Sequence, residues 1–240
     1  MKLLSKNLIK QYQKRKVVDD LSININQGEI VGLLGPNGAG KTTSFYMLVG
    51  LIRPDNGEIY LDDMNITKLP MYRRAQLGIG YLPQESSIFR DLTVEQNILA
   101  PMEINGVDKK KRKEVLEQLL SDFSIQHIRK SKGRVLSGGE RRRTEIARLL
   151  TINPKFILLD EPFAGVDPIS IGEINQLILQ LKNKNIGVLI TDHNVRETFA
   201  IAARSYLIFN GKLLKAGTTE ELINDEKVKE YYLGANFELQ

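Results

Sequence analysis

A segment of eight residues constrains the fold of this chain more than any other feature. Residues 35–42, Gly-Pro-Asn-Gly-Ala-Gly-Lys-Thr, fit the pattern G-x-x-x-x-G-K-[ST] of a phosphate-binding loop. The largely apolar run 29–34 precedes them and predicts a buried strand, while residues 42–51 predict a helix. A strand, a glycine-rich loop and a helix in this order form the context in which the pattern binds phosphate, so the sequence predicts an α/β fold.

The residue types in the loop explain its chemistry. Glycines let backbone N–H groups turn inward around phosphate oxygens, and the helix N-terminus adds a partial positive charge. Lys41 is placed to reach the β- and γ-phosphates of a nucleotide, and the Thr42 hydroxyl is placed to hold Mg²⁺. The predicted nucleotide-binding residues are Gly35, Pro36, Asn37, Gly38, Ala39, Gly40, Lys41, Thr42 and Thr43.

The composition is that of an ordinary soluble globular protein. Of the 240 residues, 42% are hydrophobic and 26% are charged, and the absence of cysteine excludes a disulfide framework and a thiolate metal site. No apolar run approaches the roughly 18 residues of a membrane span, and the N-terminus lacks the long apolar stretch of a signal peptide. We therefore expect a cytoplasmic protein.

The net charge of +5 suits a protein that contacts nucleic acid or an anionic membrane surface. Part of this charge lies in the run Lys-Lys-Lys-Arg-Lys at 109–113, at the start of a predicted helix. Such a run is most often a solvated face. It also opposes the helix dipole, which leaves a contact with a partner or with lipid open.

Strand and helix patterns alternate along the chain, with a helical stretch in the middle. Apolar strands are predicted at 57–62, 78–84, 156–159 and 186–190, and residues 1–34 are rich in strand patterns. Buried strands alternating with helices predict a doubly wound parallel sheet. We expect a single domain in which residues 1–90 and 154–225 form a nucleotide-binding core with a β subdomain, 91–153 an inserted helical subdomain and 226–240 a C-terminal tail.

Two further motifs favour a phosphate site. Residues 137–140, Ser-Gly-Gly-Glu, form a glycine-rich helix start with the spacing of a capping box, which could also receive an anion. The adjacent carboxylates Asp160 and Glu161 follow the apolar run 156–159. Because ligands bind at the carboxyl ends of parallel strands, we expect this pair to lie near the phosphate loop.

With these motifs in this order, the chain resembles the ABC-type ATPases over nearly its whole length. The resemblance implies a RecA-like core with an antiparallel β subdomain, and ATP and Mg²⁺ as cofactors. It implies that Asp160 holds Mg²⁺ and that Glu161 is the general base for the attacking water. Further roles implied by the resemblance are the signature motif for Ser137, Gly138, Gly139 and Glu140, Mg²⁺ sensing for Gln84, a γ-phosphate contact for His193 and adenine stacking for Tyr12.

The resemblance also implies partners. In the family, the signature of one copy closes over the ATP of another, so a chain with one phosphate loop and one signature is expected to form a homodimer. Several stretches resemble the ATPase subunits of lipopolysaccharide exporters, namely 78–85, 87–90, 136–143, 163–170, 190–198 and 232–237. This implies a peripheral protein on the cytoplasmic face of the inner membrane, attached through two integral subunits and without direct contact to nucleic acid.

Two alternatives stay open at this stage. An importer ATPase of the branched-chain amino acid type shares the loop sequence, although residues 141–143 and Phe237 favour the exporter. ABC ATPases that act on ribosomes or DNA usually carry two cassettes or long coiled-coil inserts, and this chain shows neither.

The segment just after Gln84 is predicted to dock the membrane subunits. Phe89, with its neighbours Ile88 and Arg90, would form a socket for a cytoplasmic helix of those subunits, because apolar residues flanked by polar ones suit a groove for an amphipathic helix. The alternative is that Phe89 and Ile88 pack the helical insertion onto the sheet.

Overall fold

A six-stranded sheet forms the centre of the computed structural model, which describes residues 1–234 and residue 237. Its strand order is β11-β10-β4-β9-β8-β7. The strands are β4 (Ile30–Leu34), β7 (Ile79–Leu82), β8 (Phe156–Asp160), β9 (Gly187–Thr191), β10 (Arg204–Phe209) and β11 (Lys212–Gly217). All neighbours pair in parallel except β11, which pairs antiparallel with β10. The predicted doubly wound sheet is confirmed.

A second, antiparallel sheet packs beside the first, as expected for the β subdomain. It consists of β1 (Lys2–Tyr12), β2 (Arg15–Leu21), β3 (Asn24–Asn26), β5 (Asn56–Leu61) and β6 (Met64–Asn65). Strand β1 is central, because it pairs with β2, β3 and β5.

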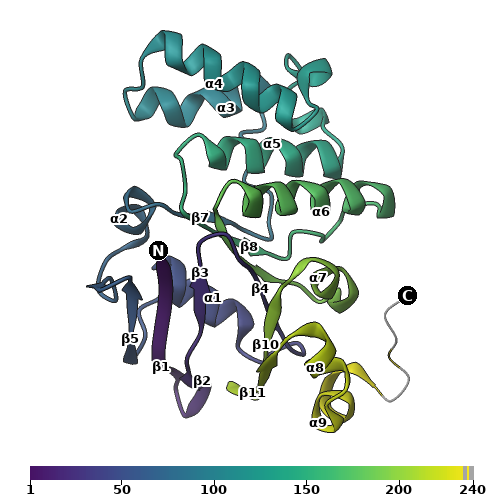
Figure 1. The fold of residues 1–240 in the computed structure, drawn as a ribbon. Helices are drawn as coiled ribbons and strands as arrows, with labels where there is room; N and C mark the ends of the chain where they lie inside the picture. The colour runs from purple at the N-terminus through teal and green to yellow at the C-terminus, as the bar shows by residue number, and fades with distance from the viewer. Residues whose placement is uncertain (235–236, 238–240) are drawn as a thin grey trace.

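Helices cover the central sheet and build a separate lobe. They are α1 (Lys41–Val49), α2 (Met71–Gln76), α3 (Val94–Ile104), α4 (Lys109–Asp122), α5 (Gly138–Leu150), α6 (Pro168–Asn183), α7 (Val195–Ile201), α8 (Thr219–Ile223) and α9 (Glu226–Val228), with short turns at Gln126–Ile128, Gly133–Val135 and Lys229–Leu233. In Figure 1, α3 and α4 lie at the top, and α5 and α6 lie between them and the sheet. Within the described residues, no helix has the length and apolar character that crossing a membrane requires.

The alternation of side chains along a buried strand divides the core in two. In β8, Ile157 and Leu159 belong to the same apolar cluster as the inner faces of α5 and α6. Phe156 and Leu158 point the other way, toward α1 and the antiparallel sheet. A strand that is buried on both faces reads as a continuous apolar run, which is the pattern seen in the sequence.

Local capping signals set the helix ends. Thr93 and Ser137 each form a capping box, with Gln96 and Glu140 respectively, and the Asp167 side chain caps α6. The helix expected over 42–51 ends two residues early, at Val49. The reason is Gly50, which takes a left-handed conformation with φ of 86°.

Part of the predicted C-terminal tail is described. Residues 226–233 form α9 and a following helical turn, and Phe237 packs edge-to-face on Phe199 of α7 at 6.3 Å between ring centroids. Residues 235–236 and 238–240 of the predicted tail lie outside the described part of the chain.

Candidate functional site

The phosphate loop joins β4 to α1, and its backbone geometry requires glycine. Gly35 has φ of 150° and Gly40 has φ of 104°. A Cβ atom on Gly35 would lie 2.2 Å from the carbonyl oxygen of Ile208, and one on Gly40 would lie 2.5 Å from that of Val17. The turn therefore packs directly against neighbouring backbone, which leaves its N–H groups on the side of the helix N-terminus.

Lys41 is the first residue of α1, and its ammonium group lies inside the loop. Its Nζ donates to the carbonyl oxygens of Gly35 at 2.7 Å and Pro36 at 3.1 Å. Burial lowers the pKa of Lys41, while the nearby carboxylates of Glu161 and Asp160 oppose that shift. The cation is held close to the loop by weak polar partners, which phosphate oxygens could replace.

Asp160 ends β8 and is the buried carboxylate of the site. Tyr81 donates its hydroxyl to Asp160 Oδ2 at 3.3 Å. Burial raises the pKa of Asp160 to about 6 despite that bond and the nearby cations, and the charge of Glu161 adds to the rise. A carboxylate in this state would be stabilised by a divalent cation.

The donor set fits Mg²⁺ held mainly by a nucleotide. Within residues 1–234 and 237, no group of three or more His, Asp or Glu side chains is arranged to hold a metal ion. Mg²⁺ commonly uses one or two protein oxygens and completes its shell with phosphates and water. The exposed Thr42 and the carboxylate of Asp160 are suited to that arrangement.

Glu161 meets two of the other predicted site residues. Gln84 Nε2 donates to Glu161 Oε2 at 2.7 Å, and His193 Nδ1 lies 3.4 Å from the same oxygen. Glu161 has φ of 45°, in the left-handed region that few residues other than glycine adopt, and its N–H donates to the carbonyl oxygen of Thr191 at 2.7 Å. The strained backbone thus directs this carboxylate toward residues from two other loops.

Asp192 lies beneath this group and is fully buried. Its carboxylate accepts hydrogen bonds from the N–H groups of Asn194 at 2.7 Å and Phe163 at 3.3 Å. Burial raises its pKa despite these bonds. Asp192 therefore ties the loop that carries His193 to the loop that follows Glu161.

The signature residues lie at the start of α5. Gly138 packs so closely against the loop at 164–167 that a Cβ atom would lie 2.8 Å from the carbonyl oxygen of Gly165. Among the described residues, no hydrogen bond or ion pair joins residues 137–140 to the phosphate loop of the same chain. Tyr12 lies at the end of β1 with its ring exposed, and the Lys10 ammonium lies 5.5 Å from the ring centroid.

Sequence reasoning missed the role of charged residues on the inner face of α5. Arg142 is buried and donates to the carbonyl oxygens of Pro83 at 2.9 Å and Asp160 at 3.2 Å. It therefore connects the signature helix to the segment before Gln84 and to the end of β8. The available signal was a charge at a position that helical spacing places on the apolar side.

Glu145, one turn further along α5, holds the segment that follows Gln84. Its buried Oε1 accepts hydrogen bonds from the N–H groups of Ser87 at 2.7 Å and Ile88 at 3.0 Å, and from the Ser86 hydroxyl at 3.0 Å. Arg148 follows on the same face and donates to the Ser87 carbonyl oxygen at 2.9 Å. A single helix thus fixes the predicted docking segment to the nucleotide site.

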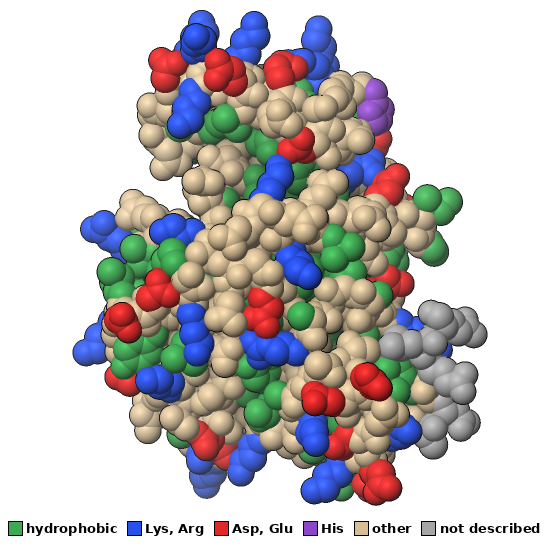
Figure 2. All heavy atoms as spheres, in the orientation of Figure 1, with side chains coloured by type: hydrophobic (Ala, Val, Ile, Leu, Met, Phe, Trp, Pro, Cys, Tyr) green, Lys and Arg blue, Asp and Glu red, His purple; other side chains and the backbone are tan. Residues whose placement is uncertain are grey.

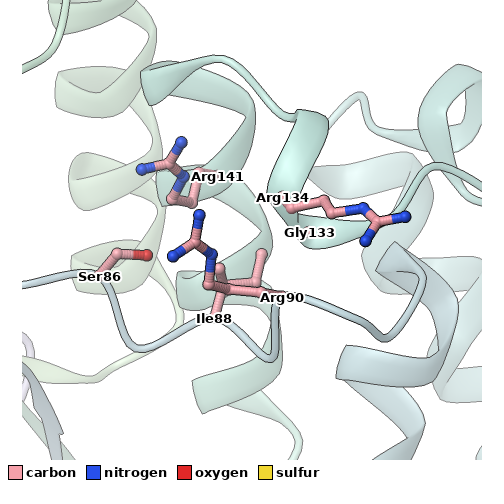
Figure 3. A pocket seen from close by; sticks show the side chains of 6 residues that line it. All are labelled: Ser86, Ile88, Arg90, Gly133, Arg134 and Arg141. Carbon is pink, nitrogen blue, oxygen red and sulfur yellow. The ribbon is translucent and has the colours of Figure 1, made fainter.

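Two of the predicted docking residues, Ile88 and Arg90, border a hollow of about 240 Å³. Figure 3 shows the guanidinium groups of Arg90 and Arg141 pointing toward the same space, whereas Arg134 extends to the other side. Phe89 is 48% exposed and lies under the Arg148 guanidinium at 4.7 Å. Ile88 is only 7% exposed and belongs to the core, so Ile88 packs in the protein interior, as the alternative to the docking hypothesis expected.

Comparison with known proteins agrees with this geometry. A family model described as "ABC transporter" matches residues 18–164. The chain belongs to the ABC transporter family. The predicted resemblance is confirmed, and with it the fold class of an ABC ATPase domain.

Individual relatives extend the match to the whole cassette. The chain is 58% identical to the "Lipopolysaccharide export system ATP-binding protein LptB" of Haemophilus influenzae, and 55% identical to the protein of the same name from Escherichia coli K12. Each comparison covers 99% of this chain and 99% of the relative. A crystal structure of a nucleotide-free ATP-binding cassette from an ABC transporter is 30% identical, with a TM-score of 0.86 over 98% of this chain and 100% of that one.

Proposed function

We propose that this cassette is the ATP-hydrolysing subunit of a lipopolysaccharide exporter, acting on the cytoplasmic face of the inner membrane. The assignment of lipopolysaccharide as the cargo rests on the identity of 55–58%, over 99% of both chains, to proteins named for lipopolysaccharide export. The same relatives favour the exporter over the branched-chain amino acid importer and over ABC ATPases of ribosomes or DNA.

The residues around the phosphate loop divide the work of hydrolysis. Lys41 exchanges its loop carbonyl partners for the β- and γ-phosphates of ATP. Thr42 and Asp160 hold Mg²⁺, assisted by Gln84, and the metal when bound neutralises charge on the phosphate oxygens. The aromatic ring of Tyr12 stacks on the adenine base.

Glu161 accepts the proton of the attacking water. It is the carboxylate nearest to both Gln84 and His193, so a water held there has an acceptor and two polar neighbours. His193 is 62% exposed at its side chain, which leaves it free to contact the γ-phosphate.

The general-base assignment is tested by Glu161→Gln. The amide keeps the size and polar contacts of the side chain but cannot take the proton. We expect ATP binding to persist while turnover falls by about 10²–10⁴. Single-turnover hydrolysis and equilibrium binding of a fluorescent ATP analogue measure the two effects, and wild-type turnover would remove Glu161 from this role.

Two copies of the cassette complete two sites. The signature residues make no hydrogen bond or ion pair to the phosphate loop of the same chain within the described residues, and Ser137 opens α5 with a helix N-terminus suited to a phosphate. We therefore assign the signature of one subunit to the ATP of its partner in a homodimer.

A mixture of two inactive chains tests this arrangement. In a heterodimer of Lys41→Ala and Ser137→Arg chains, both lesions surround one ATP and the second site is intact. Recovered ATPase activity supports the shared site. If mixed dimers form, as shown by two affinity tags, and no activity returns, either the two sites must fire together or the assignment of each signature to the partner's ATP is wrong.

The hollow that Ile88 and Arg90 border, next to Phe89 in the chain, receives a cytoplasmic helix of one membrane subunit in each of the two cassettes. The exposed ring supplies an apolar contact, and the neighbouring Arg90 and Arg141 guanidinium groups suit an acidic side chain on that helix. Purification of the tagged cassette from membranes, with mass spectrometry of the bound integral proteins, tests both the partners and the cargo. Recovery of amino acid permease subunits instead would overturn the exporter assignment.

A further inference from the structure

The helical lobe ends in an exposed, strongly basic tip, which the nucleotide site does not use. We define this basic tip as Ile104, the last residue of α3, together with Lys109–Lys113, the first residues of α4. Ile104 is 83% exposed. In Figure 2, Lys and Arg side chains project from the top of the molecule, where α4 lies, with some carboxylates close by.

Most of the charged side chains of the basic tip have no ion-pair partner among the described residues. Arg112 is paired with Glu103 at 2.6 Å, and the Asp108 carboxylate caps α4 by accepting the N–H groups of Lys110 and Lys111. Within the described residues, the side chains of Lys109, Lys110, Lys111 and Lys113 form no hydrogen bond or ion pair.

Three of these lysines, Lys109, Lys110 and Lys111, also lie in the first turn of their helix. The N-terminus of a helix carries a partial positive charge, so cations in the first turn destabilise it. Helical spacing from the buried Leu116, Leu119 and Leu120 directs Lys110 and Lys111 outward. The arrangement costs the isolated chain stability, and an anionic surface would reverse that cost.

We propose that the basic tip binds the anionic phospholipid headgroups of the membrane surface. This proposal rests on the proposed function, because a docked exporter subunit is held next to that membrane. The charge is complementary to an anionic leaflet, and Ile104 supplies an apolar contact for the interface between headgroups and acyl chains.

The length of α3 is compatible with simultaneous docking and lipid contact. The helix begins just past the docking segment at Phe89 and its 11 residues span about 16 Å before the basic tip. Polybasic segments act within about one Debye length, or about 8 Å in physiological salt.

Vesicle co-sedimentation of the full chain tests the proposal. The probes are phosphatidylcholine vesicles with and without phosphatidylglycerol, at low and high salt. The test variant replaces Lys109, Lys110, Lys111 and Lys113 by Gln. Each lysine near an anionic surface contributes about fivefold in affinity, so we expect binding of the test variant to weaken by at least about 100-fold.

A matched variant controls for net charge. It replaces Lys2, Lys68, Lys182 and Lys227 by Gln, all of them exposed and outside the basic tip. We expect it to bind phosphatidylglycerol vesicles much as the wild type does, with binding lost at high salt. Equal loss in both variants, or wild-type binding by the test variant, overturns the proposal.

Two further measurements distinguish lipid binding from nucleic-acid binding and from the proposed ATPase function. Stronger binding of duplex DNA or RNA than of phosphatidylglycerol vesicles, abolished by the same four substitutions, would overturn the lipid assignment. ATPase activity of the test variant distinguishes this proposal from the proposed function. Retained turnover with lost vesicle binding supports a separate lipid contact, whereas a failure of hydrolysis in the wild type concerns only the function proposed above.

Discussion

Replacing Arg74 by Met is expected to destabilise the whole phosphate-binding half of the cassette. Arg74 lies in α2 and is only 1% exposed. Its guanidinium donates to four backbone carbonyl oxygens, those of Met47, Leu48, Thr67 and Leu69, at 2.7–3.0 Å.

Two of these oxygens belong to the last turn of α1, the helix that starts at the phosphate loop. The N–H groups that follow, from Gly50 to Ile52, all donate to Tyr46 instead, so Arg74 closes the end of α1. A cation at a helix C-terminus is also favoured by the helix dipole. The guanidinium thus holds α1 in place from the end opposite to Lys41.

The size of the effect follows from two opposing terms. Burial lowers the pKa of Arg74 to about 10, which corresponds to a cost of about 3 kcal/mol for keeping the charge inside. Four hydrogen bonds from a charged donor contribute about 1.5–3 kcal/mol each, which exceeds that cost. We expect Arg74→Met to reduce the free energy of unfolding by at least about 3 kcal/mol, and Tm by roughly 6–12 °C.

Thermal and urea unfolding of the nucleotide-free chain measure this change. Arg73→Met is the matched control, because Arg73 is an exposed neighbour whose guanidinium donates, within the described part of the chain, only to Gln76, at 3.3 Å. Arg74→Lys keeps the charge but loses the forked donor geometry, so an intermediate loss is expected. If Arg74→Met unfolds within about 0.5 kcal/mol of the Arg73 control, the four carbonyl contacts do not stabilise α1 and the reasoning fails.

Other predictions concern single contacts. Phe89→Ala should cost at most about 1 kcal/mol of stability, since the ring is half exposed, yet abolish pull-down of the membrane subunits; a large stability loss with retained binding would support a core role. Asp160→Asn should raise the Tm of the nucleotide-free chain at pH 8 but not at pH 4. Because folding raises the pKa of Asp160 from 3.8 to about 6, its ionisation costs stability progressively between those two pH values, and the full cost applies at pH 8. Mg²⁺-ATP binding should weaken in the same variant, and an unchanged Tm at pH 8 would contradict the burial argument. Gly139→Ala should lower the free energy of unfolding by about 1–3 kcal/mol, because its Cβ would lie 2.6 Å from the Ser170 hydroxyl. Gly172→Ala, where the Cβ meets open space, should raise the free energy of unfolding by about 0.5–1 kcal/mol. Urea unfolding of both variants checks the contrast, and equal effects would refute it.

Features that depend on neighbours in the chain were predictable. The phosphate loop, the capping residues Thr93, Ser137 and Asp167, and the buried run of β8 follow from hydrogen bonds and periodicities that span a few residues. The resemblance then extended these local signals to a whole cassette, and the family match confirmed it.

Helix ends and the two sides of the docking segment were harder to predict. Helical propensity alone does not reveal that Gly50 adopts a left-handed conformation that ends α1. Ile88 and Phe89 are adjacent and both apolar, yet the core takes one side chain and leaves the other at the surface. Burial of that kind depends on which elements pack nearby, so composition cannot resolve it.

The sequence by itself determined the phosphate loop, the strand–loop–helix unit around it and the order of the motifs, because each is written in adjacent residues. Only the tertiary structure decided which charges become buried connectors. Arg142 reaches carbonyl oxygens 59 and 18 residues before and after it, and Glu145 accepts N–H groups 57 and 58 residues away. Such contacts form where the folded backbone brings distant segments together, and no local spacing records that distance.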